Sequence, residues 1–210
     1  MKKLYRIDFK SGKVIFSLLL ILLFSIGCLS AYASMQSKDD VTNEFRLSDL
    51  SGDIEEQFTS PEQVHPGEDY SKEVRITNTS DAAFFVRVRI FPEIRSAENV
   101  LLPANIGEEA ELQLDIQEFP TSGWLLGEDG YYYYMNEIES GEETEILFST
   151  VHLNETLGDP YSGAVMRIDI QSEMITSSGS QYRDAWWSGE APATGNLQQI
   201  DTQLQQIIGE

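Results

Sequence analysis

The residues best suited to catalysis are few and far apart. The chain has two histidines, His65 and His152, and neither belongs to a His-Glu-x-x-His motif that could bind zinc. No Gly-x-Ser-x-Gly elbow is present to expose a nucleophilic serine. A Ser-His-Asp triad assembled from distant segments stays open as an alternative. Since no motif points to hydrolysis, we expect a protein that is not an enzyme and has no catalytic residues.

Carboxylates are so abundant that no pair of them stands out. With 35 Asp and Glu residues, a glycosidase-type pair cannot be distinguished from a solvated acidic surface. Oxygen ligands suit calcium, but the sequence has no Asp-x-Asp-x-Asp-Gly loop. We therefore expect no cofactor and name no metal ligands, leaving weak calcium binding through unidentified carboxylates as an alternative.

The N-terminus has the three parts of an export signal. Five basic residues precede an apolar run from Val14 to Cys28, and Ala31 and Ala33 are small residues at the positions that a signal peptidase requires. We predict that residues 1–33 are a signal peptide and that the mature chain begins at Ser34. The protein would then be secreted, to the extracellular matrix or the cell surface, and would meet the membrane only through this segment before cleavage.

Two alternatives to cleavage are open. The segment could remain as a membrane anchor, although its apolar run is shorter than the ~20 residues that span a bilayer. Cys28 could instead be lipidated. Cys28 is the only cysteine, so a chain cleaved after Ala33 would contain neither a disulfide nor a thiolate.

The predicted mature chain is strongly acidic. Residues 1–33 hold five of the 14 Lys and Arg and one of the 35 Asp and Glu, which leaves 9 basic against 34 acidic residues, a formal charge of −25. This charge argues against nucleic acid as a partner, because phosphates require a positive surface. The acidity is also an ordinary means of keeping a protein soluble.

From residue 34 to 176 the chain is typical of a β-sandwich. Short runs with period-two alternation, separated by turn residues, predict an all-β domain of two packed antiparallel sheets. The strongest such run is 83–91, and we expect Pro92 to end its ladder. Phe84, Val86, Val88 and Ile90 share one face, and Phe85 and Phe91 lie on the arginine side, so we expect both faces to be partly covered. The first run places four residues on one face of a strand: Val41, Asn43, Phe45 and Leu47.

Aromatic residues are the most unusual local feature. Trp124 to Met135 reads as a hairpin with Asp-Gly in its turn, and its second strand contains four consecutive tyrosines, 131–134. Alternate tyrosines face opposite sides of a strand. Packing in the core beside Trp124 is one interpretation, and a contact platform is the other. Candidate contact aromatics are Tyr132, Tyr134, Trp186 and Trp187.

The region 177–210 has a different composition. A linker rich in Ser and Gly precedes a Gln-rich stretch in which Leu197, Ile200, Leu204 and Ile207 recur at helical spacing. We predict a short amphipathic helix capped by Asn196 or Thr194. It would pack on its own sandwich, fray as a tail, or act as a docking or self-association helix.

Four groups of residues follow one another along the chain: 41–45 with 54–58, then 66–67 with 72–79 and 85–88, then 124 with 130–134, and finally 168–173 with 185–186. Together, in this order and spacing, they resemble the TasA/camelysin family of Gram-positive exported proteins, in particular its SipW-dependent biofilm matrix subgroup. The resemblance extends over most of residues 1–187, whereas Ser188–Glu210 departs from the family pattern.

The resemblance implies a jelly-roll sandwich released by a SipW-type signal peptidase. It also implies subunits that polymerise into biofilm-matrix fibres when an N-terminal strand of one copy completes the sheet of the next. Here the donor segment would be residues 34–47, and the partner would be a second copy or a related fibre protein. The alternative is a cell-surface binding or accessory module that contacts polysaccharide or a fibre-forming protein.

Overall fold

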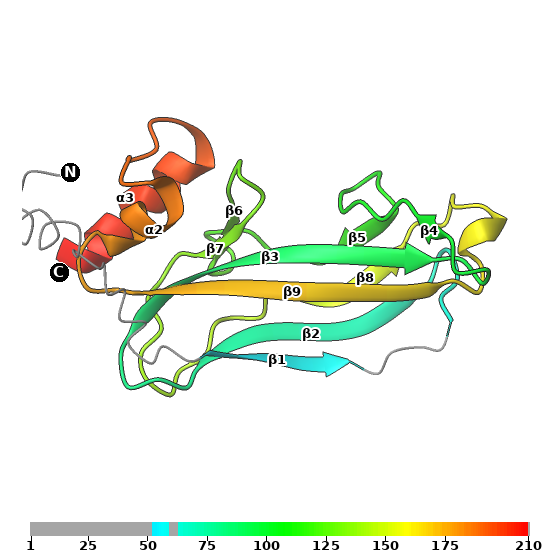
Figure 1. The fold of residues 1–210 in the computed structure, drawn as a ribbon, viewed down its shortest axis with the longest axis horizontal. Coiled ribbons are helices and arrows are strands. Elements are labelled where there is room, and N and C mark those ends of the chain that lie inside the picture. Colours follow the sequence, from blue (N-terminus) through cyan, green and yellow to red (C-terminus); the bar gives the residue numbers. More distant parts are fainter. Residues whose placement is uncertain (1–51, 59–62, 210) are drawn as a thin grey trace, which may run out of the picture. The chain divides into compact units, whose positions relative to one another are not determined.

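The described part of the chain forms two antiparallel sheets. The computed structural model describes residues 52–58 and 63–209, and all elements below belong to these (Figure 1). The predicted signal peptide (1–33), its cleavage residues and the predicted donor segment (34–47) therefore lie outside the described residues.

The first sheet has the strand order β1-β2-β8-β5. Its strands are β1 (Gly52–Phe58), β2 (Asp69–Asn78), β8 (Phe148–Leu153) and β5 (Leu112–Leu114). From Lys72 to Asn78, every second residue of β2 is buried, because one face of the sheet forms the core and the other faces solvent.

The second sheet has the order β4-β3-β7-β6, with β9 paired to the other edge of β3. Its strands are β4 (Leu101–Leu102), β3 (Phe84–Arg95), β7 (Tyr132–Tyr134), β6 (Trp124–Leu126) and β9 (Val165–Thr176). A short 3-10 turn, η1 (Asp159–Tyr161), lies between β8 and β9. Two antiparallel sheets confirm the predicted all-β, sandwich-like fold.

The main core lies between the sheets. Phe84, Val86 and Val88 of β3 are fully buried there and pack in one cluster with Val74 and Phe148 of the first sheet. The alternation that predicted the strand also predicted this buried face. The prediction that Pro92 ends the strand was wrong, since β3 continues to Arg95. The other edge of β3 pairs with β7 only at 87–88 and with β4 only at 94–95, so Pro92 falls where a missing donor is tolerated.

A second apolar cluster covers the opposite face of the second sheet. Helices α2 (Gln181–Trp187) and α3 (Gly195–Gly209) lie at one end of β3 and β9 (Figure 1). The buried members of the cluster are Phe85, Leu125, Tyr133, Met135, Ile175, Tyr182, Ile200 and Leu204. Of the three possibilities left open for the C-terminal helix, packing on its own sandwich is the one observed.

The segment before that helix is not only a linker. Helix α2 spans seven residues of the predicted Ser- and Gly-rich stretch. A helix this short gains little from propensity, and Tyr182, fully buried against the sheet, supplies the packing that stabilises it.

Replacing Leu204 with alanine should lower the free energy of unfolding by about 2–5 kcal/mol, because it leaves a cavity between α3 and the sheet. Urea denaturation followed by tryptophan fluorescence measures this loss. The exposed Gln206→Ala on the same helix is the control and should change stability by no more than about 0.5 kcal/mol. Equal effects of the two variants would contradict a docked helix.

Candidate functional site

The first candidate site is the outer edge of β9, the edge that faces away from β3. This strand pairs with β3 at twelve positions, from Thr176 opposite Phe84 to Val165 opposite Arg95. Among the described residues, no strand pairs with its other edge. A row of unpaired backbone donors and acceptors is a template for adding another strand.

Apolar side chains beneath this edge are incompletely covered. Met166 and Ile168 are 5% exposed, whereas Ile170 and Met174 farther along β9 are only partly buried against the core. Ile54 of β1, on the other sheet, is also only partly buried. An added strand with an apolar face would cover more of these side chains.

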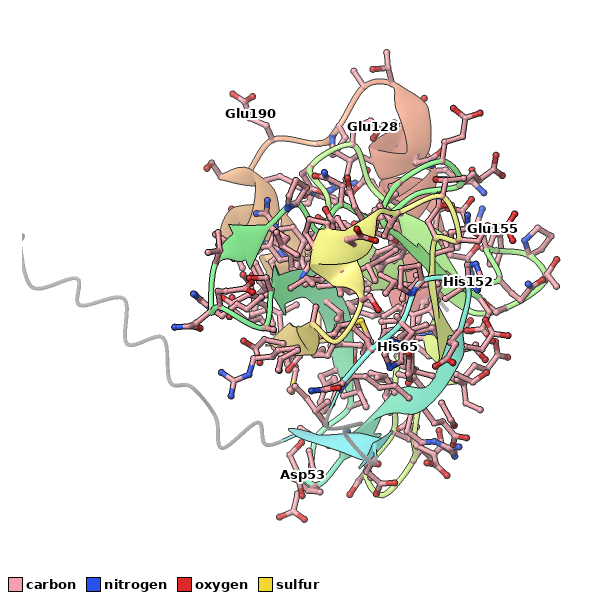
Figure 2. The ribbon with its side chains drawn as sticks, turned by 90° about the vertical axis from the view of Figure 1, so that its right-hand side faces the viewer. Asp53, His65, Glu128, His152, Glu155 and Glu190 are labelled. Atoms are coloured by element: carbon pink, nitrogen blue, oxygen red, sulfur yellow. The ribbon has the colours of Figure 1, made fainter. Side chains whose placement is uncertain are left out.

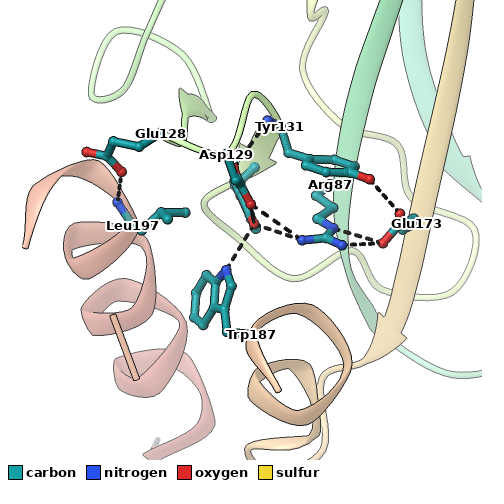
Figure 3. Close-up of polar contacts among 8 residues, drawn as sticks. Arg87, Glu128, Asp129, Tyr131, Glu173, Trp187 and Leu197 are labelled. Carbon is teal, nitrogen blue, oxygen red and sulfur yellow. Dashed lines mark hydrogen bonds and ion pairs between the residues drawn. The ribbon is translucent and has the colours of Figure 1, made fainter. Parts of the chain in front are cut away.

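The second candidate site is a polar and aromatic cluster beneath α2, which we call the Arg87 cluster. Its members are Arg87, Asp129, Tyr131, Tyr133, Glu173, Trp186 and Trp187. The Arg87 side chain is 9% exposed, and its Nε and Nη2 donate to Glu173 Oε2 at 2.9 and 2.6 Å (Figure 3). Its Nη1 donates to Tyr133 Oη at 3.0 Å and lies 3.6 Å from Asp129 Oδ2.

Aromatic rings surround the same guanidinium. Its Cζ lies 3.9 Å from the ring centroid of Tyr131 and 5.3 Å from that of Trp186, which are cation–π distances. Tyr131 Oη in turn donates to Glu173 Oε1 at 2.9 Å. The planar cation is thus paired with a carboxylate and lies within cation–π distance of two rings, an arrangement that lysine could not reproduce.

Tyr133 links the sheet to α2. Its hydroxyl donates to Asp129 Oδ2 at 2.7 Å and accepts a hydrogen bond from Trp187 Nε1 at 3.2 Å. Burial, with the hydrogen bond to Asp129, raises the pKa of Tyr133, so the hydroxyl stays a neutral donor. Burial alone would lower the pKa of Arg87, but its hydrogen bonds to Tyr133 and Glu173 outweigh burial and raise it.

A carboxylate on the hairpin turn caps α3. Glu128 accepts a hydrogen bond from the backbone N–H of Leu197 at 3.0 Å (Figure 3) and another from the backbone N–H of Asn196 at 2.6 Å. These bonds lower the pKa of Glu128, the bond from Leu197 contributing most. Of the two predicted caps, Thr194 directly precedes the helix, and its carbonyl accepts a hydrogen bond from Gln198 N–H at 3.4 Å. The prediction of Asn196 was wrong, because its side chain donates to Leu126 O. The capping carboxylate of Glu128 lies 68 residues from Asn196 in sequence, so no local pattern could reveal it.

The two helices are joined by a further ion pair. Arg183 Nε and Nη2 donate to the two oxygens of Asp201 at 2.6 and 2.8 Å. Tyr182 donates to Asp201 Oδ1 at 2.7 Å, and burial is the main cause that raises the pKa of Tyr182 to about 12. The polar contacts of both helices are therefore directed inward, to each other and to the sheet.

The predicted contact aromatics occupy three different environments. Tyr134 is 7% exposed and packs against Trp124 with centroids 5.1 Å apart, so it belongs to the core and cannot serve as a surface contact. Tyr132 is half-buried and lines a cleft of about 540 Å³ with Leu114 and Leu126. Trp186 and Trp187 are half-buried in the Arg87 cluster, where each packs on Tyr133. The structure does not bring the four together as one patch.

Both histidines lie at the end of the first sheet where β2 begins (Figure 2). His152 Nδ1 is 2.7 Å from Asp69 Oδ1, and His65 Nδ1 is 3.3 Å from Ser162 Oγ. Nucleophilic catalysis requires a base that is itself oriented by a third group. Within residues 52–58 and 63–209, no carboxylate bonds to His65 and no nucleophile bonds to His152.

Among the described residues, no group of three or more His, Cys, Asp or Glu side chains could hold a metal ion. None of the described helices is long and apolar enough to cross a membrane.

No family model, curated protein or solved structure matches the chain.

Replacing Arg87 with alanine should lower the free energy of unfolding by about 2–4 kcal/mol, since it leaves Glu173 without its cation beneath α2. Denaturation followed by near-UV circular dichroism would report both the stability and the packing of the two tryptophans. Arg89→Ala, an exposed position on the same strand, should stay within about 0.5 kcal/mol. A neutral Arg87→Ala variant would show that the cluster does not hold α2.

Acid should release the cap of α3. A lowered pKa means that Glu128 stabilises the docked helix above its ordinary pKa of about 4.3, and that this stabilisation is lost as pH falls through the lower, folded value. In an NMR titration, the amide proton of Leu197 should shift with a midpoint below about 4.3. Glu128→Gln should abolish this shift, and an unchanged titration in that variant would assign it to another group.

Proposed function

We propose that this chain is a secreted structural subunit of an extracellular matrix fibre that assembles by strand addition. The outer edge of β9, with which no described strand pairs, is the observation that carries the proposal. Residues 34–47 would supply the donor strand after signal cleavage. The fold in finer detail would be a jelly roll, which is supported by β2 and β3, and β8 and β9, being consecutive strands in opposite sheets.

The edge of β9 suits a donor of this length and pattern. It offers twelve residues, and its exposed Arg167 and Asp169 project from the outer face of the sheet, out of the plane in which a strand would add. The donor carries Val41, Phe45 and Leu47 on one face. These side chains would extend the inner face beyond Ile170 and Met174, which are only partly buried.

The resemblance to the TasA/camelysin family supports the same proposal. It places the donor strand directly after the signal peptide, so that cleavage by a SipW-type peptidase would free the strand and control assembly. A strand that is released only outside the cell avoids pairing with other sheets during export.

A groove on α3 favours a second candidate function, that of an accessory module that binds neutral polysaccharide. The groove, of about 330 Å³, is lined by Phe119, Gly195, Thr202 and four glutamines, with no charged residue. The glutamines are Gln198, Gln199, Gln203 and Gln206, and their side chains bond to no other described residue. Free amides and an aromatic ring suit sugar hydroxyls and the apolar face of a sugar ring.

Electron microscopy of the mature chain tests the leading proposal. A chain that begins at Ser34 should form fibres, whereas the same chain with an N-terminal tag should not, because the tag obstructs the donor strand. A synthetic peptide of residues 38–48 should inhibit fibre growth by occupying the acceptor edge.

The control peptide carries Phe45→Asp, which would place a charge against the apolar inner face. Equal inhibition by both peptides would argue against strand addition. Monodisperse particles from tagged and untagged chains, across salt and acid conditions, would favour the accessory module.

A further inference from the structure

Beyond α2 and α3, no described helix covers the outer face of β3 and β9, and we call this uncovered part the bare face. Figure 1 shows α2 and α3 at one end of these strands. Register and alternation place nine residues on this bare face. They are Arg89, Phe91, Glu93, Arg95, Leu101, Val165, Arg167, Asp169 and Gln171.

The bare face is basic in a strongly acidic protein. It holds three arginines against two carboxylates, while the whole chain has 14 Lys and Arg against 35 Asp and Glu. Two of these arginines, Arg95 and Arg167, have a carboxylate on the same face, Glu93 and Asp169.

Arg89 has no such partner. Each of the other five described arginines forms an ion pair with a described carboxylate, but Arg89 does not. Its guanidinium instead lies 5.5 Å from the ring of Phe91 and 5.4 Å from that of Tyr131. Aromatic rings orient a guanidinium while leaving its N–H donors free for an anion.

Exposed apolar side chains gather on the same face. Five large hydrophobic residues are exposed within the described residues, and three of them, Phe91 (39%), Leu101 (60%) and Val165 (53%), belong to the bare face. An arginine without an ion pair to a described carboxylate, next to exposed apolar side chains, is typical of protein interfaces, in which arginine and aromatic residues are enriched.

We propose that the bare face binds an acidic segment of a second copy of this chain, the segment 139–146. This contact deepens the proposed fibre function and rests on it, but it uses side chains rather than the backbone edge. Ile146, another of the five exposed hydrophobic residues, follows Glu145 directly. Glu139 and Glu142 are exposed and make no side-chain hydrogen bond or ion pair with a described residue.

The two surfaces complement each other in charge and polarity. Carboxylates of Glu139 and Glu142 would meet Arg89, and Ile146 would meet Phe91 and Val165. The contact joins different surfaces of two copies, so in a pair each copy keeps one of its two surfaces free for a further copy. Such a heterologous contact can extend along or between fibres, whereas a symmetric contact would stop at a dimer.

Cysteine cross-linking tests the contact directly, because the predicted mature chain has no cysteine of its own. Tagged mature chains with Phe91→Cys and with Ile146→Cys are mixed and treated with a bismaleimide. The N-terminal tag blocks strand addition, so the cross-linking result does not depend on whether the untagged chain assembles by strand addition. The matched control replaces Ile146→Cys with Glu155→Cys, another exposed position.

We expect the Phe91–Ile146 pair to cross-link at least about tenfold faster than the control pair, and Arg89→Glu to remove that advantage. A partner carrying Glu139→Arg and Glu142→Arg should restore cross-linking to the Arg89→Glu chain. The contact should also weaken as salt is raised. Circular dichroism would confirm that Arg89→Glu, at an exposed position, folds normally.

Two results would overturn the proposal. One is equal cross-linking of the test and control pairs. The other is that Arg89→Glu abolishes binding of polygalacturonate but leaves cross-linking unchanged. That result would assign the bare face to acidic polysaccharide. If the untagged chain forms no fibres but the Phe91–Ile146 cross-link still forms, strand addition would be contradicted and the contact through the bare face would stand.

Discussion

Burial of the Arg87 guanidinium is the constraint on which the arrangement of the second sheet and its helices depends. A buried cation is costly unless its hydrogen bonds and charge are satisfied. In the two ladders of β3, Arg87 lies opposite Glu173 of β9 and opposite Tyr133 of β7. A slip of one residue in β3 would turn Arg87 into the apolar core. The cation therefore specifies the register of three strands as well as the surface that receives α2.

Much of the sheet structure was predictable, because it follows from local alternation. The pattern of Phe84, Val86 and Val88 indicated a buried face, and Phe85 on the arginine side indicated that the second face was partly covered too. Both features are observed. Leu197 and Leu204 likewise indicated the apolar stripe of α3. Strands and helix faces that follow from local periodicity can therefore be predicted from the sequence alone.

The interactions that assemble the candidate sites could not be predicted, because they join distant residues. Tyr133 and Glu173 lie 46 and 86 residues from Arg87. Tyr132 and Tyr134 share one face of β7, yet neighbouring side chains bury Tyr134 and leave Tyr132 at the rim of a cleft. Helix α2 has no strong local signal and exists through its packing. The free edge of β9 is visible only when all pairings of the described strands are known.

The ladder between β3 and β9 has a mechanical consequence. Its twelve residue pairs lie along one axis. A force applied along that axis, at opposite ends of the two strands, loads all of their hydrogen bonds in shear, so they must break together. A force applied across the strands would instead peel them apart one pair at a time. A subunit pulled along these strands would therefore resist tension much more strongly than one pulled across them, although it has no described disulfide to hold it.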